Sequence, residues 1–131
     1  MNEENKKVIA LYLTKINIET QHQIYVSVYQ RIKELGYALV LINTSNDMYH
    51  YNGLSTGDGD IFSLVNYDLI DGVIILSETI KDDIILSNII SSVKSHNVPI
   101  VSIDKHIPEV YNINFDYSEA MEKIVRHIVE Y

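Results

Sequence analysis

The stretch Asp71-Gly72-Val73-Ile74-Ile75-Leu76 decides the fold of this 131-residue chain. It is a short apolar run rich in β-branched residues. Such a run, without alternation of apolar and polar positions, is typical of a strand buried on both faces of a parallel sheet. Similar runs occur at residues 8–13, 38–42 and 99–103. Residues 111–115 alternate instead, and we expect them to form an edge strand.

Helical patterns separate these runs. Residues 20–35 carry one apolar stripe at helical spacing, and Gly36 follows as a left-handed stop. Further helices are predicted over residues 60–70, 82–96 and 117–131, with Asp82 able to cap the second of these three. Alternating strands and helices imply parallel strands joined by right-handed crossovers. We therefore predict one α/β domain, a doubly wound parallel sheet of about five strands in the order 2-1-3-4-5, with helices on both faces.

The composition excludes several classes of protein. Asp and Glu number 18 against 10 Lys and Arg, so the net charge is -8. Surfaces that bind nucleic acid or anionic membranes need clustered cations, and we expect neither partner here. No cysteine is present, which excludes disulfides, thiolate metal sites and cysteine nucleophiles. The polar start and the lack of any apolar stretch near 20 residues predict a cytoplasmic chain.

The sequence motifs of two protein classes that commonly contain such a sheet are missing from this chain. A response-regulator receiver needs an acidic pair after the first strand, where this chain has Thr14-Lys15-Ile16-Asn17. A dinucleotide-binding unit needs Gly-x-Gly-x-x-Gly at that turn, which contains no glycine. Gly57-Asp58-Gly59 precedes the wrong strand and carries a carboxylate that would repel phosphate, so we interpret it as a loop.

A third identity has support from an ordered set of motifs. They are Gly36-Tyr37 after a long helix, Asn43 at the end of a strand, Asp71-Gly72-Val73-Ile74, Val98-Pro99-Ile100-Val101-Ser102-Ile103-Asp104, and a late helix with His127-Ile128. This set, spanning residues 7–131, resembles the N-terminal lobe of LacI/GalR regulators and periplasmic type I sugar-binding proteins. The chain departs from that pattern at Asn17-Ile18-Glu19-Thr20, and residues 46–66 are longer and more polar.

The resemblance implies a non-catalytic, ligand-sensing lobe of a bacterial signalling or transcription-regulatory protein. Residues 1–131 would be the N-terminal half of a two-lobed domain, cut before its second lobe. Residues 61–72 look closer to lobes found ahead of GGDEF diguanylate cyclase or kinase modules. Family members commonly pair through this lobe, so a homodimer is expected. Tyr25 and Tyr29 lie at helical spacing and fit either that dimer face or ordinary boundary packing.

The candidate ligand-binding residues follow the carboxyl ends of the strands, where open α/β sheets bind their ligands. They carry hydroxyls, an amide, a carboxylate and a cation, which suit a small polar ligand such as a sugar, an amino acid or a nucleoside. Asp104 can instead cap a turn, and Lys105 replaces the arginine usual in the family. The set is Thr14, Asn17, Ser77, Thr79, Asp104 and Lys105.

No catalytic, metal or cofactor site is expected. The five histidines show no ligand spacing, and Asp58 and Asp60 lack the spacing of an EF-hand. No Gly-x-Ser-x-Gly motif exposes a serine nucleophile. The alternative function is a small stand-alone enzyme with a cleft at the strand ends, using Ser77, Asp104 and Lys105.

Overall fold

The structure is a computed structural model that describes residues 5–45 and 61–130. The predicted loop features Gly57, Asp58, Gly59, Asp60 and His50 lie outside these residues. The elements in chain order are β1 Val8–Thr14, α1 Glu19–Glu34, β2 Ala38–Thr44, the 3-10 helices η1 Ile61–Leu64 and η2 Tyr67–Leu69, β3 Gly72–Leu76, η3 Ser77–Thr79, α3 Asp83–Ser95, β4 Ile100–Ile103, β5 Tyr111–Ile113 and α4 Ser118–Glu130.

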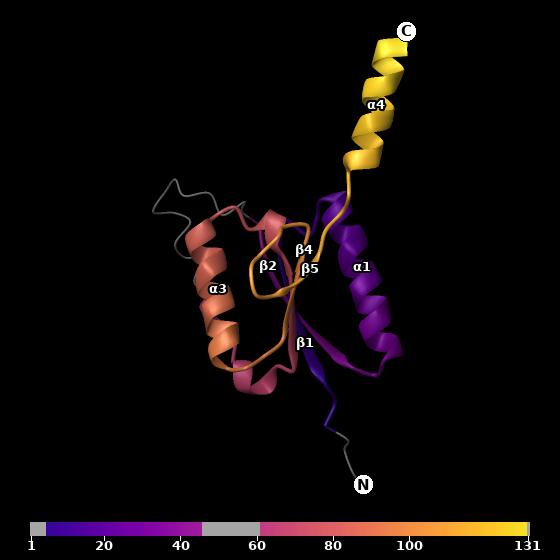
Figure 1. The fold of residues 1–131 in the computed structure, drawn as a ribbon. Helices are drawn as coiled ribbons and strands as arrows, with labels where there is room; N and C mark the ends of the chain where they lie inside the picture. Colours follow the sequence, from indigo (N-terminus) through magenta and orange to yellow (C-terminus); the bar gives the residue numbers. More distant parts are fainter. Residues whose placement is uncertain (1–4, 46–60, 131) are drawn as a thin grey trace.

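The five strands form one parallel sheet in the order β2-β1-β3-β4-β5. This confirms the predicted fold class and strand order. Helices α1 and α3 lie on opposite sides of the sheet (Figure 1). Residues 111–113 form the predicted edge strand, two residues shorter than expected.

The Asp71-Gly72 pair aligns the two central strands at their start. The Asp71 carboxylate accepts a hydrogen bond from the Val8 backbone N–H at 2.8 Å, and the Asp71 N–H donates to the Val8 carbonyl at 2.8 Å. At Gly72 a Cβ atom would lie 3.1 Å from Cδ1 of Ile9, so the missing side chain permits close packing of β3 against β1.

Helices α1 and α3 end in the same way. After α1, Gly36 has a φ of 73°, and the N–H groups of Gly36 and Tyr37 donate to the carbonyls of Lys33 and Ile32. This Schellman motif confirms the predicted stop. After α3, Asn97 takes the same left-handed position with a φ of 56°. At the other end of α3, Asp82 accepts hydrogen bonds from the N–H groups of two residues in the first turn and caps the helix as predicted.

Two predictions from periodicity were wrong. Residues 61–70 do not form a continuous α-helix but two 3-10 turns, because the Asn66 side chain accepts the Asp68 N–H and interrupts the helical ladder. This break lets Phe62 and Tyr67 both reach the core. Strand β2 is apolar but lies at the sheet edge, and Val40 is 37% exposed, so it is not buried on both faces.

The buried core lies mainly on the α3 side of the sheet. There, strand residues such as Tyr12, Val73 and Ile75 pack with Ile89 of α3 and with Phe62. The hydroxyls of Tyr12 and Tyr67 are 2.8 Å apart inside this core, and burial raises the pKa of both phenols. On the α1 side, the buried cluster consists of Leu11, Leu13 and Leu76 with half-buried side chains packed against it, and Ile32 of α1 is also buried.

Helix α4 covers neither side of the sheet. It leaves the end of β5 and projects away from the rest of the chain (Figure 1), and none of its described residues is buried. The predicted helix therefore exists, and it lies away from the sheet. Among residues 5–45 and 61–130, no helix is both long and apolar enough to cross a membrane.

Candidate functional site

A cleft of about 670 Å³ opens at the carboxyl ends of β1, β3 and β4. The N-terminal half of α1 forms one wall with Thr20, Gln21 and Ser27, and the segment after β5 adds Phe115 and Tyr117. Leu76 and Ile103 are among its apolar lining residues. This is the edge of the sheet at which the sequence predicted a ligand site.

Thr14 and Thr79 both line the cleft, but both of their hydroxyl groups donate hydrogen bonds to backbone carbonyls within the protein. The Thr14 hydroxyl donates to the Thr79 carbonyl at 2.7 Å, and the Thr14 N–H donates to the Thr79 hydroxyl at 3.1 Å. The Thr79 hydroxyl in turn donates to the Leu76 carbonyl at 2.7 Å. These bonds tie the end of β1 to the turn after β3, so the two threonines shape the cleft and leave only acceptor lone pairs for a ligand.

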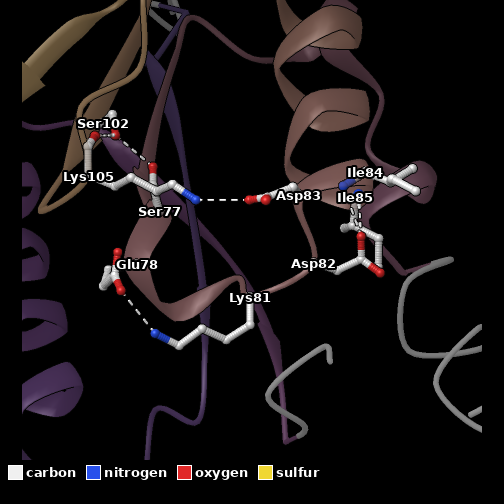
Figure 2. A network of polar contacts seen from close by, with 9 residues as sticks. All are labelled: Ser77, Glu78, Lys81, Asp82, Asp83, Ile84, Ile85, Ser102 and Lys105. Atoms are coloured by element: carbon white, nitrogen blue, oxygen red, sulfur yellow. Dashed lines mark hydrogen bonds and ion pairs between the residues drawn. The ribbon is translucent and has the colours of Figure 1, made fainter. Parts of the chain in front are cut away.

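Ser77 lies below the cleft and does not line it. Its side chain is fully buried, and its hydroxyl oxygen is 2.6 Å from that of Ser102 (Figure 2). Because Ser102 donates its one proton to the Lys105 carbonyl at 2.7 Å, Ser77 is the donor to Ser102. This chain of hydrogen bonds fixes the turn after β4 against the end of β3.

Asp104 and Lys105 diverge at the end of β4. The Lys105 ammonium donates to the Asp83 carboxylate at 3.0 Å, at the start of α3 (Figure 2), and does not line the cleft. Asp104 does line the cleft. The sequence-adjacent pair therefore does not act together on one ligand atom.

The backbone at Asp104 holds its carboxylate at the cleft. Asp104 has a φ of 69°, a left-handed conformation that Asp tolerates better than most residues, and its N–H donates to the Ile113 carbonyl at 2.8 Å. Within residues 5–45 and 61–130, no hydrogen bond or ion pair engages its carboxylate. It is an available acceptor in a partly apolar recess.

Asn17 is exposed in the turn before α1 and does not line the cleft. This turn also starts with a left-handed residue, Lys15, whose φ is 52° and whose N–H donates to the Thr44 carbonyl at 2.7 Å. The predicted set is thus divided. Thr14, Thr79 and Asp104 come together in the cleft, whereas Asn17, Ser77 and Lys105 lie outside it.

Several cleft residues escaped the sequence analysis. Thr20 and Ser27 lie seven residues apart, two turns of helix, beside the apolar stripe of α1, and that spacing was a usable signal. Phe115 and Tyr117 follow the edge strand at alternate positions, with ring centroids 6.1 Å apart. Lys81 and Glu78 contribute an ion pair of 3.0 Å at the rim (Figure 2).

The structure does not gather the residues of the alternative enzyme in the cleft. Ser77, Asp104 and Lys105, the residues of the alternative enzyme, do not meet, and the Ser77 hydroxyl is buried. Across the described parts of the chain, no three His, Asp or Glu residues are grouped as metal ligands.

The two tyrosines singled out on α1 differ in burial. Tyr25 packs against the α1-side core. Tyr29 stacks on Tyr25 with ring centroids 6.1 Å apart and is 43% exposed.

Known proteins resemble this chain in structure but not in sequence. No family model and no curated protein sequence matches it. Two solved structures match over 98% of the chain at 17% identity: the Lac repressor dimer bound to operator and the anti-inducer ONPF, with a TM-score of 0.69, and the Lac repressor bound to ONPG in the repressed state, with a TM-score of 0.70.

The chain spans only 42% and 36% of the length of those two structures. The likeness gives no support to the resemblance to lobes that precede diguanylate cyclase modules. What it shows is the fold: a five-stranded parallel α/β sheet of the kind found in a lobe of the Lac repressor.

Proposed function

We propose that this chain is one lobe of a small-molecule sensor and that its ligand binds at the strand-end cleft. The observation that carries the proposal is the Asp104 carboxylate, which lines the cleft without a partner among the described residues. Phe115 and Tyr117 offer apolar faces beside it. A carboxylate next to aromatic faces suits a ligand with several hydroxyls or an ammonium group, such as a sugar, an amino acid or a nucleoside.

The lobe regulates rather than catalyses in this proposal. The structural neighbours are a repressor described with its operator, with an anti-inducer and with ONPG, and their fold is shared over nearly the whole of this chain. By analogy, residues 1–131 would be the N-terminal half of a two-lobed domain that acts on an output module of a cytoplasmic homodimer. Closure of a second lobe would complete the burial of the ligand.

This proposal predicts weak binding by residues 1–131. A single lobe offers only part of the contacts, and each new hydrogen bond replaces one to water for a net gain of about 1 kcal/mol. A few such bonds do not offset the cost of immobilising a free ligand. We expect affinities no tighter than about 100 μM, which corresponds to about -5.5 kcal/mol.

The test is a titration of the 15N-labelled chain with sugars, amino acids and nucleosides, followed by NMR. We expect saturable shifts at Thr79, Asp104 and Tyr117 for one ligand class, lost in Asp104→Asn and kept in Asp68→Asn, an exposed carboxylate of η2 far from the cleft. Absence of shifts for every class, or shifts unaffected by Asp104→Asn, would contradict a site at the cleft. A ligand that residues 1–131 alone bind with micromolar affinity would show that they form a complete receptor or enzyme and would contradict the half-domain proposal.

A further inference from the structure

Among the described residues, the serine and threonine hydroxyls that line the cleft offer a ligand only acceptors. The Thr14 and Thr79 hydroxyls donate to backbone carbonyls at 2.7 Å. On the α1 wall, the Ser27 hydroxyl donates to the backbone carbonyl four residues earlier at 3.0 Å, and the Thr20 hydroxyl donates to the side-chain oxygen of Gln21 at 3.0 Å. Because a hydroxyl has one proton, each of the four keeps only lone pairs for a ligand.

The other side-chain donors of the cleft lie on side chains that water reaches. They belong to Gln21, Gln23, Lys81 and Tyr117, and none of these residues is buried. The Lys81 ammonium already donates to the Glu78 carboxylate at 3.0 Å. Thr14, by contrast, is 1% exposed. The most deeply buried polar side chain of the lining is therefore an acceptor.

The charges of the cleft leave one carboxylate in excess. Among the described lining residues, Glu78 and Asp104 are acidic and Lys81 is basic. Glu78 and Lys81 form an ion pair, so the half-buried Asp104 carboxylate is left over. Glu19, in the first turn of α1, offsets the positive end of that helix. A positively charged ligand group would therefore gain energy in this cleft, and a negatively charged group would lose it.

Two aromatic rings line the same cleft. The ring centroids of Phe115 and Tyr117 are 6.1 Å apart, with the planes tilted by 46°. The residues are 53% and 59% exposed, so the rings are open to a ligand. Ring faces attract cations and also cover apolar carbon atoms. Together with Leu76 and Ile103, they suit an apolar body attached to the charged group.

We propose that the ligand of the cleft is an organic amine with an apolar body. Its ammonium group binds Asp104 and the threonine acceptors, and its body lies on Phe115 and Tyr117. This inference rests on the proposed function, the binding of a small molecule at the cleft, and narrows its ligand class. An ammonium group has three protons and no lone pair, so it satisfies acceptors without leaving an unpaired atom of its own. The cleft volume of about 670 Å³ is in the range of small-molecule sites.

Neutral sugars and free amino acids match this arrangement less well. Each sugar hydroxyl has an oxygen that needs a donor when it leaves water, and the serine and threonine hydroxyls of the cleft supply none. A free amino acid adds a carboxylate, which the Asp104 carboxylate repels. An amine without a carboxylate avoids both costs.

Two probes with the same carbon skeleton isolate the charge. At pH 7, 2-phenylethylamine carries an ammonium group, and 2-phenylethanol carries a neutral hydroxyl in its place. The 15N-labelled chain is titrated with each probe and with glucose, and the amides of Thr79, Asp104 and Tyr117 are followed by NMR. We expect the amine to bind at least tenfold more tightly than the alcohol or glucose, and added salt to weaken the amine alone.

Two variants assign this preference to a residue. In Asp104→Asn the amine should bind no more than about threefold more tightly than the alcohol, since the ion pair is lost and only the rings still attract the cation. Asparagine tolerates the left-handed backbone at this position, where φ is 69°. Asp68→Asn is the matched control, because Asp68 is an exposed carboxylate that does not line the cleft, and it should keep the full preference.

Failure of this inference differs from failure of the proposed function. Cleft shifts with equal affinity for amine and alcohol, tighter binding of glucose, or a preference that survives Asp104→Asn would overturn the amine as the ligand class and leave a small-molecule site at the cleft. Absence of cleft shifts with these probes and with every sugar, amino acid and nucleoside would overturn both.

Discussion

The two sides of the sheet differ in how completely the chain covers them. On the α3 side, twelve of the described residues form one buried cluster, drawn from the strands, α3, the turns of residues 61–70 and Ile80 after η3. On the α1 side, the buried cluster contains three of the described residues, and Ile32 of α1 is buried as well. The α3 side holds the larger buried cluster, whereas the α1 side borders the cleft. We therefore expect truncation of a residue on the α3 side to cost more stability than truncation of a residue on the α1 side.

The largest expected effect comes from truncating the same residue type on each side. Ile89→Ala in α3 removes a side chain that is 3% exposed and leaves a cavity in the main cluster, so we expect a loss of about 2–5 kcal/mol in the free energy of unfolding. Ile24→Ala in α1, where the isoleucine is half-buried, should lose about 1 kcal/mol. Urea denaturation measures both, and equal losses would refute the asymmetry.

The buried tyrosine pair gives the next largest effect. Tyr12→Phe leaves the Tyr67 hydroxyl without its partner, and we expect a loss of about 1–3 kcal/mol. The double variant with Tyr67→Phe should lose less than the sum of the two single variants, since both polar groups are then gone. A double-mutant cycle in urea measures this coupling; additive losses would show that the hydroxyls do not interact.

The same pair predicts the alkaline limit of stability. Burial, and for Tyr12 also the hydrogen bond with Tyr67, keeps the phenols protonated in the folded state, so their pKa values are raised above the ordinary 10.0. Their contribution is fully present below about pH 10 and is lost as the pH rises above it, because only the unfolded chain then releases the protons. The decline above pH 10 should be shallower in the Tyr12→Phe/Tyr67→Phe variant.

Substitutions at the left-handed residues that follow α1 and α3 are expected to have smaller effects on stability. Gly36→Ala places a Cβ at a φ of 73° after α1, and we expect a loss of about 1 kcal/mol. Asn97→Gly after α3 occupies the same left-handed position without strain and should change stability by less than about 0.5 kcal/mol. Thermal unfolding of the two variants checks the difference. A neutral Gly36→Ala would contradict the assigned role of this glycine.

The smallest effect concerns the exposed carboxylate that aligns β1 and β3. The Val8 N–H and the Lys7 ammonium hold the pKa of Asp71 below its ordinary value of 3.8. Its contribution is therefore present above about pH 4 and is lost as the pH falls through the folded-state pKa. Asp71→Asn should lower the urea midpoint at pH 7 and converge with the parent chain at pH 2. A constant difference across this range would exclude ionisation as the cause.

The sequence predicted the strands and their order because buried parallel strands carry apolar runs that local helical patterns separate. It missed the break at Asn66, since a single side-chain hydrogen bond outweighs three turns of apolar periodicity. The predicted order placed β2 at the sheet edge correctly, but its apolar run was wrongly taken to be buried on both faces, because such a run does not distinguish an edge strand from a central one.

The candidate site was only partly predictable for a different reason. Strand ends identify the correct edge of the sheet, and Asp104, Thr14 and Thr79 lie there as predicted. Which side chains point into the cleft depends on turns of one or two residues. The left-handed backbone at Asp104 aims adjacent side chains in different directions, so Lys105 reaches Asp83 instead. The cleft walls formed by α1 and by Phe115 depend on tertiary packing, which the spacing of residues in the sequence does not determine.

The most direct test of the asymmetry between the two sides of the sheet is the amide hydrogen exchange of the two helices that cover them. Because α3 packs on the twelve-residue buried cluster, its amides should exchange slowly, at a rate close to that of global unfolding. Amides of α1, which packs on a cluster of three buried residues, should exchange faster through local opening. Equal protection of the two helices, or slower exchange in α1, would contradict the asymmetry.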